Sequence, residues 1–113
     1  KPKVEAWQRL LRAYLAGRQN LRRVFLLIDA RHGLKANDEE IMGLLDRAAV
    51  PYQLVLTKVD KLKPADRDPV ARATADRSRR FPACHPDVLT TSAEKRWGLE
   101  TVREAVAAAL SPA

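Results

Sequence analysis

Thr57-Lys58-Val59-Asp60 is the stretch of this sequence whose residue types best fit a chemical task. The carboxylate of Asp60 can accept two hydrogen bonds, and guanine offers two donors in the matching place, N1–H and the exocyclic N2 amine. Adenine has neither donor there, so such a carboxylate would select guanine. The apolar stem of Lys58 can cover the base while its ammonium stays in water, and Thr57 can tie the loop to its neighbours. The alternative is a solvated turn after a strand.

A second short pattern, Ser92-Ala93-Glu94, follows the next apolar segment and precedes the last helical segment. The backbone N–H of Ala93 could meet guanine O6, because a small side chain lets the backbone come close to the base. The two patterns, in this order, fit the [NT]KxD and SA patterns with which GTPases read guanine. Their joint occurrence at successive strand ends makes a chance match much less frequent than for either pattern alone.

Three apolar segments must position these residues, and each is expected to be a short buried strand. They are Val24–Ile28 ending at Asp29, Gln53–Thr57 and Val88–Thr91. Four helices are expected between and around them. They run from Val4 to about Ala16, from an N-cap at Asn37 with Glu40 completing a capping box, from Asp68-Pro69 to about Arg80, and from Leu99 onward, where Leu99, Val102, Val106, Ala109 and Leu110 share one face.

The order α-β-α-β-α-β-α predicts an α/β fold, doubly wound, with three parallel strands and four helices. Ligands of such sheets bind beyond the carboxyl ends of the strands. Asp29-Ala30-Arg31-His32 also lies at such an end, and we expect Asp29 to brace its own loop against Arg31. Trp97 is expected to pack under the last helix, and a place at the rim of a base pocket is the alternative.

Composition places the chain among globular proteins of one domain. It has 113 residues, 46% apolar and 31% charged, which is too apolar for a disordered chain. No run reaches the roughly 18 apolar residues of a membrane span, and residues 1–7 contain no apolar segment of signal-peptide type. A single cysteine, Cys84, fits a reducing compartment. A cytoplasmic location without membrane contact is therefore expected.

The balance of charge favours polyanionic partners. Lys and Arg number 21 against 14 Asp and Glu, a net charge of +7, and RNA is the usual cytosolic polyanion. The arginines concentrate on the first and third expected helices. The alternative is solubilising charge on solvated helix faces, with pairs such as Arg72–Asp76.

Phosphate-binding and metal-binding motifs are absent from this sequence. None of its four glycines is followed by lysine, so there is no GxxxxGK[ST] loop, and none follows an aspartate at the DxxG spacing. Cys84-His85 has His32 as the only other histidine and no CxxC spacing, so a surface loop pair is expected and no metal site. No GxSxG surrounds Ser92, and no catalytic residue is predicted.

The chain resembles the C-terminal half of the EngB (YihA/YsxC) family of bacterial ribosome-assembly GTPases over nearly its whole length. Asp29-Ala30-Arg31-His32 together with Leu56-Thr57-Lys58-Val59-Asp60-Lys61-Leu62 are the sharpest matching segments. Further matches are Trp7, Tyr14-Leu15, Arg18, Leu21, Leu27-Ile28, Asp38, Val50-Pro51 and Thr91-Ser92-Ala93, and residues 63–86 are the least informative.

The resemblance implies that residues 1–113 are the C-terminal part of a GTPase (G) domain, a partial P-loop GTPase fold without the half that holds phosphates and metal. GTP or GDP would be the ligand, bound weakly or not at all by this chain alone, with Mg only in an intact parent protein. The implied guanine-binding residues are Thr57, Lys58, Val59, Asp60, Thr91, Ser92 and Ala93.

The implied role is ribosome large-subunit assembly, and through it normal cell division and septation, with ribosomal RNA or the large ribosomal subunit as partner. A non-catalytic basic module that binds RNA or protein is the alternative function. An unrelated α/β nucleotide binder is a third class.

The strand at Val24–Asp29 is expected to be an open edge. In the family's fold it sits beside the strand that leads into the phosphate loop, and this sequence contains no such loop. Val24-Phe25-Leu26-Leu27-Ile28 carries no charge or proline to discourage pairing. Self-association through this edge is expected, and a monomer whose first helix shifts to cover the edge is the alternative.

We predict that the purified chain does not hydrolyse GTP. Phosphoryl transfer depends on a phosphate cradle and magnesium, and the sequence carries neither motif. An assay of phosphate release with and without magnesium checks this. Sustained magnesium-dependent release above a protein-free blank would contradict it.

Overall fold

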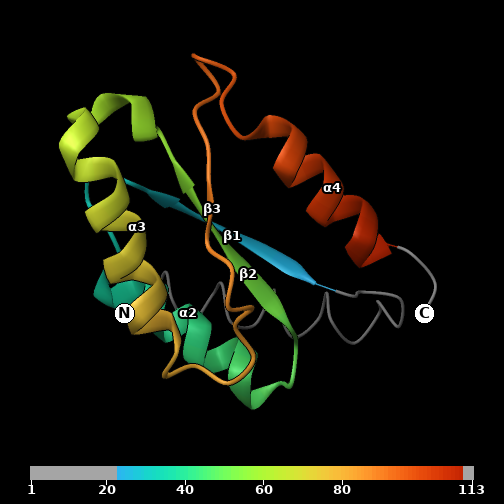
Figure 1. The fold of residues 1–113 in the computed structure, drawn as a ribbon. Helices are drawn as coiled ribbons and strands as arrows, with labels where there is room; N and C mark the ends of the chain where they lie inside the picture. Colours follow the sequence, from blue (N-terminus) through green and yellow to red (C-terminus); the bar gives the residue numbers. More distant parts are fainter. Residues whose placement is uncertain (1–22, 111–113) are drawn as a thin grey trace.

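A computed structural model describes residues 23–110 as a parallel sheet with helices packed on it (Figure 1). Along the chain the elements are β1 (Val24–Asp29), α2 (Ala36–Arg47), β2 (Tyr52–Thr57), the 3-10 helix η1 (Val59–Lys61), α3 (Pro64–Ser78), β3 (Leu89–Thr90) and α4 (Leu99–Leu110). The predicted α/β fold with three parallel strands is confirmed. Three of the four expected helices are seen, and the one expected from Val4 to Ala16 lies outside the described residues.

The register of the sheet brings the ends of the strands to one edge. The order is β1-β2-β3, and both pairings are parallel. Asp29 pairs with Thr57, and Leu56 pairs with Thr90. Residues that follow β1, β2 and β3 therefore emerge side by side, as expected for the ligand-binding edge of a parallel sheet.

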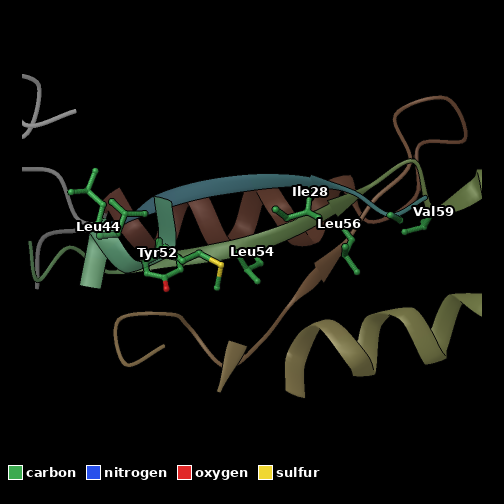
Figure 2. Packing of buried hydrophobic residues seen from close by; sticks show 9 residues of the cluster. Ile28, Leu44, Tyr52, Leu54, Leu56 and Val59 are labelled. Carbon is green, nitrogen blue, oxygen red and sulfur yellow. The ribbon is translucent and has the colours of Figure 1, made fainter. Parts of the chain in front are cut away.

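The hydrophobic core lies between the sheet and the helices α2 and α3. Tyr52, Leu54 and Leu56 are at most 1% exposed, and Figure 2 shows the side chains of the core cluster gathered along the strands. Met42 and Leu45 of α2 join the same cluster and are fully buried. In Figures 1 and 2, α3 and α4 lie on opposite sides of the strands. Five of the six residues of β2 are buried, and Thr57 at its end is partly exposed. This burial is expected for a central strand that is covered on both faces.

A polar contact closes the core at the end opposite the strand carboxyl ends. The carboxylate Oδ1 of Asp46 accepts hydrogen bonds from the hydroxyl of Tyr52 (3.2 Å) and from the backbone N–H of Ala83 (2.9 Å). Burial and the neighbouring Asp46 raise the pKa of the Tyr52 phenol. The contact ties the end of α2 to the start of β2 and to the loop before β3.

Two predicted helix starts are wrong. The N-cap of α2 is Lys35 and not Asn37. The Asp38 carboxylate accepts a hydrogen bond from the backbone N–H of Lys35 (2.9 Å), so the helix begins two residues earlier than predicted. Helix α3 begins at Pro64 and not at Asp68-Pro69. Pro64 sits in the first turn, where its fixed φ suits a helix start and its missing N–H costs nothing, and Pro69 is accommodated inside the helix.

Candidate functional site

The carboxylate of Asp60 is fixed by the loop after β3. Its Oδ1 accepts a hydrogen bond of 2.6 Å from the hydroxyl of Ser92, a fully buried residue. The Ser92 hydroxyl in turn accepts from the backbone N–H of Lys95 (3.1 Å). The Asp60 side chain is only 5% exposed, and its Oδ2 lies 3.7 Å from Lys61 Nζ. The side chain is therefore held in one orientation before any ligand arrives.

The electrostatics of the loop keep Asp60 ionised. The hydrogen bond from Ser92 lowers the pKa of the Asp60 carboxyl, with a further contribution from Lys61, and the two outweigh desolvation, which acts in the opposite direction. Because the pKa is lower folded than unfolded, this contact stabilises the fold above the ordinary pKa of aspartate. The stabilisation is lost as pH falls through the lowered value.

Backbone and hydroxyl contacts pin the two loops together. The N–H of Val59 donates to the carbonyl of Thr91 (3.1 Å), and the Thr91 hydroxyl donates to the carbonyl of Leu56 (3.0 Å). On the other side, the Thr57 hydroxyl donates to the carbonyl of Ile28 (3.3 Å). The structure thus brings together the two segments that the sequence singled out, residues 57–60 and 91–93.

Lys58 is held in an unusual backbone conformation beside β1. Its φ is +58°, a left-handed conformation that costs a non-glycine residue about 1–2 kcal/mol. Its ammonium lies 3.7 Å from Asp29 Oδ2. Asp29 is itself bound by the guanidinium and backbone N–H of Arg31, and these contacts hold the pKa of its carboxyl well below the usual range. The predicted brace of Asp29 against Arg31 is confirmed, and its contact with Lys58 was not foreseen.

An ion pair that sequence analysis missed joins the two loops at the surface. Lys61 Nζ lies 2.8 Å from Glu94 Oε2, and this contact raises the pKa of the Lys61 ammonium. The sequence held one signal of this pair: Lys61 directly follows the first motif, and Glu94, of opposite charge, lies within the second. Both side chains are about half exposed or more, so the pair is screened by solvent.

Trp97 does not pack under the last helix as predicted. Trp97 is 40% exposed, and the Arg67 guanidinium lies 4.8 Å from the centre of the indole ring. Two backbone hydrogen bonds join Trp97 to Ser92. Ala93, between these anchored residues, is exposed, and among residues 23–110 its backbone N–H has no hydrogen-bond partner.

The arginines of α3 and of the turn at residues 79–80 form different pairs from those predicted. Asp76 pairs with Arg79 instead of Arg72, and Arg77 pairs with Glu39 of α2. Arg72 and Arg80 are exposed, without an ion pair in the described part of the chain.

Cys84 lies half-buried in the loop before β3, and burial raises the pKa of its thiol to about 11. Within the described residues no group of three or more His, Cys, Asp or Glu side chains could hold a metal ion. None of the helices described is both long and apolar enough to cross a membrane.

Comparisons with known proteins agree with the resemblance seen in the sequence. The probable GTP-binding protein EngB of Cereibacter sphaeroides is 53% identical over 107 residues, which are 95% of this chain and 49% of that protein. The EngB protein of Sinorhizobium medicae is 50% identical over 111 residues, 98% of this chain and 51% of that protein. The chain corresponds to the C-terminal half of an EngB family protein. It spans about half the length of these curated relatives, and no family model matches it.

Solved structures support the fold. The apo form of translation elongation factor SelB from Methanococcus maripaludis is similar in structure, with a TM-score of 0.77. The match covers 94% of this chain and 24% of the elongation factor. The same factor in complex with the GTP analogue GppNHp matches 80% of this chain and 21% of its own length with a TM-score of 0.68. Sequence identity is 19% in both cases, so the likeness establishes the α/β fold alone.

Removal of the Ser92 hydroxyl should raise the pKa of Asp60. In Ser92→Ala the carboxylate loses its short hydrogen bond, and the pKa should return toward the ordinary value of 3.8. Because the folded and unfolded pKa values of Asp60 then approach each other, the stabilisation that this carboxyl contributes above its ordinary pKa, and loses on acidification, should shrink. Side-chain carboxyl NMR against pH measures the shift. Ser78→Ala, which removes another buried serine hydroxyl, is the control, and an unchanged Asp60 pKa in Ser92→Ala would contradict the assignment.

Proposed function

We propose that this chain is the guanine-reading part of a G domain in a GTP-binding protein. The observation that carries the proposal is the Asp60 carboxylate, which is held at the carboxyl edge of the sheet by a 2.6 Å hydrogen bond from Ser92. The relatives are named probable GTP-binding protein EngB, which supports the same chemistry. The proposal concerns base recognition, and the phosphates would be bound by residues that this sequence does not contain.

The proposal gives a partner to three polar groups of guanine: N1–H, the N2 amine and O6. An ionised carboxylate has about four lone-pair sites, so Asp60 can accept from N1–H and the N2 amine while Ser92 occupies one site on Oδ1. The N–H of Ala93, which has no hydrogen-bond partner among residues 23–110, would donate to O6. Lys58 would cover the base plane, steadied by Asp29. Thr57, Val59 and Thr91 act through their backbone and hydroxyl contacts, which hold the two loops in place.

The residues present do not fit a magnesium site. Among residues 23–110 there is no cluster of acidic, histidine or cysteine side chains that could hold a cation, and the sequence lacks the DxxG motif. No step through magnesium is therefore assigned to this chain. GTP or GDP would be held here by the base alone, and magnesium would belong to an intact parent protein.

We predict weak but selective nucleotide binding. Each hydrogen bond to a carboxylate contributes about tenfold or more in affinity, while loss of translational and rotational freedom costs about 4 kcal/mol or more. The isolated chain should therefore bind GDP with a Kd in the millimolar range or weaker, and ADP more weakly still. NMR titration follows the amides of residues 57–60 and 91–94.

The matched variants are Asp60→Ala and Asp66→Ala. Asp60→Ala removes both acceptors and should abolish the preference for GDP over ADP. Asp66→Ala removes an exposed acid in the first turn of α3 and should leave the preference intact. Equal shifts with GDP and ADP in the wild-type chain, or none at these loops, would count against the proposal.

The wider role we propose is assembly of the large ribosomal subunit in the cytoplasm, and through it cell division and septation. The family resemblance motivates this role, and the net charge of +7 supports a ribosomal RNA partner. Helix α3 presents exposed arginines and buries only Thr74 and Ser78 fully. The same helix also favours the second candidate, a basic interaction module in which the nucleotide loops are idle.

Salt dependence of RNA binding tests this surface. Each neutralised phosphate adds about 0.9 to the slope of log affinity against log salt on duplexes and about 0.7 on single strands. The double variant Arg72→Ala/Arg80→Ala should lower the slope for a ribosomal RNA fragment by between about 1.4 and 1.8. Arg103→Ala on α4, where Arg103 pairs with Glu100, is the control. An unchanged slope in the double variant would exclude Arg72 and Arg80 from the RNA-binding surface.

Self-association through β1 is a further part of the proposal. The amides of Val24 and Ala30 donate toward β2, so by alternation those of Phe25 and Leu27 point away from it. Within the described residues this outer edge has no strand partner. Leu27 is 65% exposed, and an unprotected apolar edge is a template for another strand.

Sedimentation at several concentrations tests the edge. The mass of the wild-type chain should rise with concentration, and Leu27→Lys should lower it because a charge at an edge discourages pairing. Ala73→Lys adds the same charge at an exposed position of α3 and should have no effect. A monomer at all concentrations, with the Phe25 and Leu27 amides protected from exchange, would favour the monomer with a covered edge.

A further inference from the structure

Arg67 of α3 reaches across a cavity of about 460 Å³ that lies between α3, β3 and the start of α4. Its Nε donates to the backbone carbonyl of Val59 (3.2 Å), and its guanidinium lies 4.8 Å from the centre of the Trp97 ring. The side chain is half-buried. One planar cation therefore contacts two loops that lie 38 residues apart in the sequence, at Val59 and Trp97.

One contact ends on the backbone of Val59 and the other on the ring of Trp97, and both residues adjoin the proposed guanine-binding residues. Val59 lies between Lys58 and Asp60. Trp97 exchanges two backbone hydrogen bonds with Ser92, of 3.1 and 3.0 Å. Arg67 is thus connected to Asp60 through the adjacent residue Val59. It is connected to Ser92 through Trp97 and its two backbone hydrogen bonds.

Both loops contain backbone conformations that need support. Lys58 and Arg96 have φ of +58° and +61°, and left-handed conformations of non-glycine residues persist only where surrounding contacts fix them. Gly98, at φ +71°, passes so close to β3 that a Cβ there would lie 2.0 Å from the carbonyl oxygen of Thr90. A charged hydrogen bond and a cation–π contact from a rigid helix supply such support.

We infer that Arg67 and Trp97 form a latch that holds the 58–61 and 92–97 loops in register, so that the Asp60 carboxylate stays aligned with the Ser92 hydroxyl. Arg67 is a positioning residue, because it acts through Val59 and Trp97 and not on the base. The effect on nucleotide binding rests on the proposed function. The effect on loop order does not, since it concerns the free protein.

Amide hydrogen exchange of the free chain tests the latch directly. In Arg67→Ala the amides of Val59, Lys61 and Trp97, which bond to Thr91, Lys58 and Ser92, should exchange about three- to tenfold faster. Arg67→Lys keeps the charge but loses the planar group, and it should loosen the same amides. Arg72→Ala, an exposed arginine of the same helix, is the matched control.

The Tyr52 amide, which bonds to Ala83 far from the loops, reports global opening. If Arg67→Ala speeds its exchange equally, Trp97→Leu at the exposed end of the contact replaces that variant, and the same local acceleration is expected. Unchanged exchange at Val59 and Trp97, or acceleration no greater than at Tyr52 in both variants, would overturn the latch.

Nucleotide titration then separates the latch from the proposed function. Arg67→Ala should weaken GDP binding about three- to tenfold and keep the preference for GDP over ADP, because Asp60 is still present. Faster loop exchange without any guanine preference in the wild-type chain would retain the latch and reject the base-reading function. Loss of preference in Arg67→Ala with unchanged loop exchange would assign Arg67 to the base itself and reject the latch.

Discussion

The hydrogen bond from Ser92 to Asp60 is the contact on which the candidate site depends. It joins two loops from different strands, and at 2.6 Å it fixes one carboxylate oxygen while the other stays near Lys61. A carboxylate that selects a base must present its oxygens along fixed directions, because a freely rotating group would lose the geometric match. The buried serine supplies this orientation, and it also favours the ionised form by lowering the pKa of Asp60.

The sheet makes that hydrogen bond possible. Parallel pairing of β2 with β3 places Thr91 beside Leu56, and the Thr91 hydroxyl and amide both bond to the Leu56 carbonyl. The strands are held in this register by the core between the sheet and α2, in which Leu54 and Leu45 are fully buried. A slip of one residue would turn these side chains out of the core and separate the two loops. Burial of apolar side chains thus fixes the position of a polar contact at the edge of the sheet.

The strands and the two motifs could be predicted from the sequence because each is a local pattern. The apolar runs of β1 and β2 and the four residues ending at Asp60 need no knowledge of distant contacts. The two wrong helix starts have a common cause. Asn37 and Asp68 are favourable N-cap residues, but in each case the helix already begins a few residues earlier, after Lys35 in α2 and at Pro64 in α3. The Lys61–Glu94 pair and the Arg67–Trp97 contact join residues about 30 apart, and their geometry exists only once the loops are assembled.

Comparison of GDP with inosine diphosphate tests base reading by Asp60 most directly, because inosine keeps N1–H and O6 but lacks the N2 amine. The wild-type chain should bind GDP about tenfold more tightly than inosine diphosphate, as expected for one hydrogen bond to a carboxylate. In Asp60→Ala the two nucleotides should bind equally. Equal affinity in the wild-type chain, or a preference that persists in Asp60→Ala, would contradict the account.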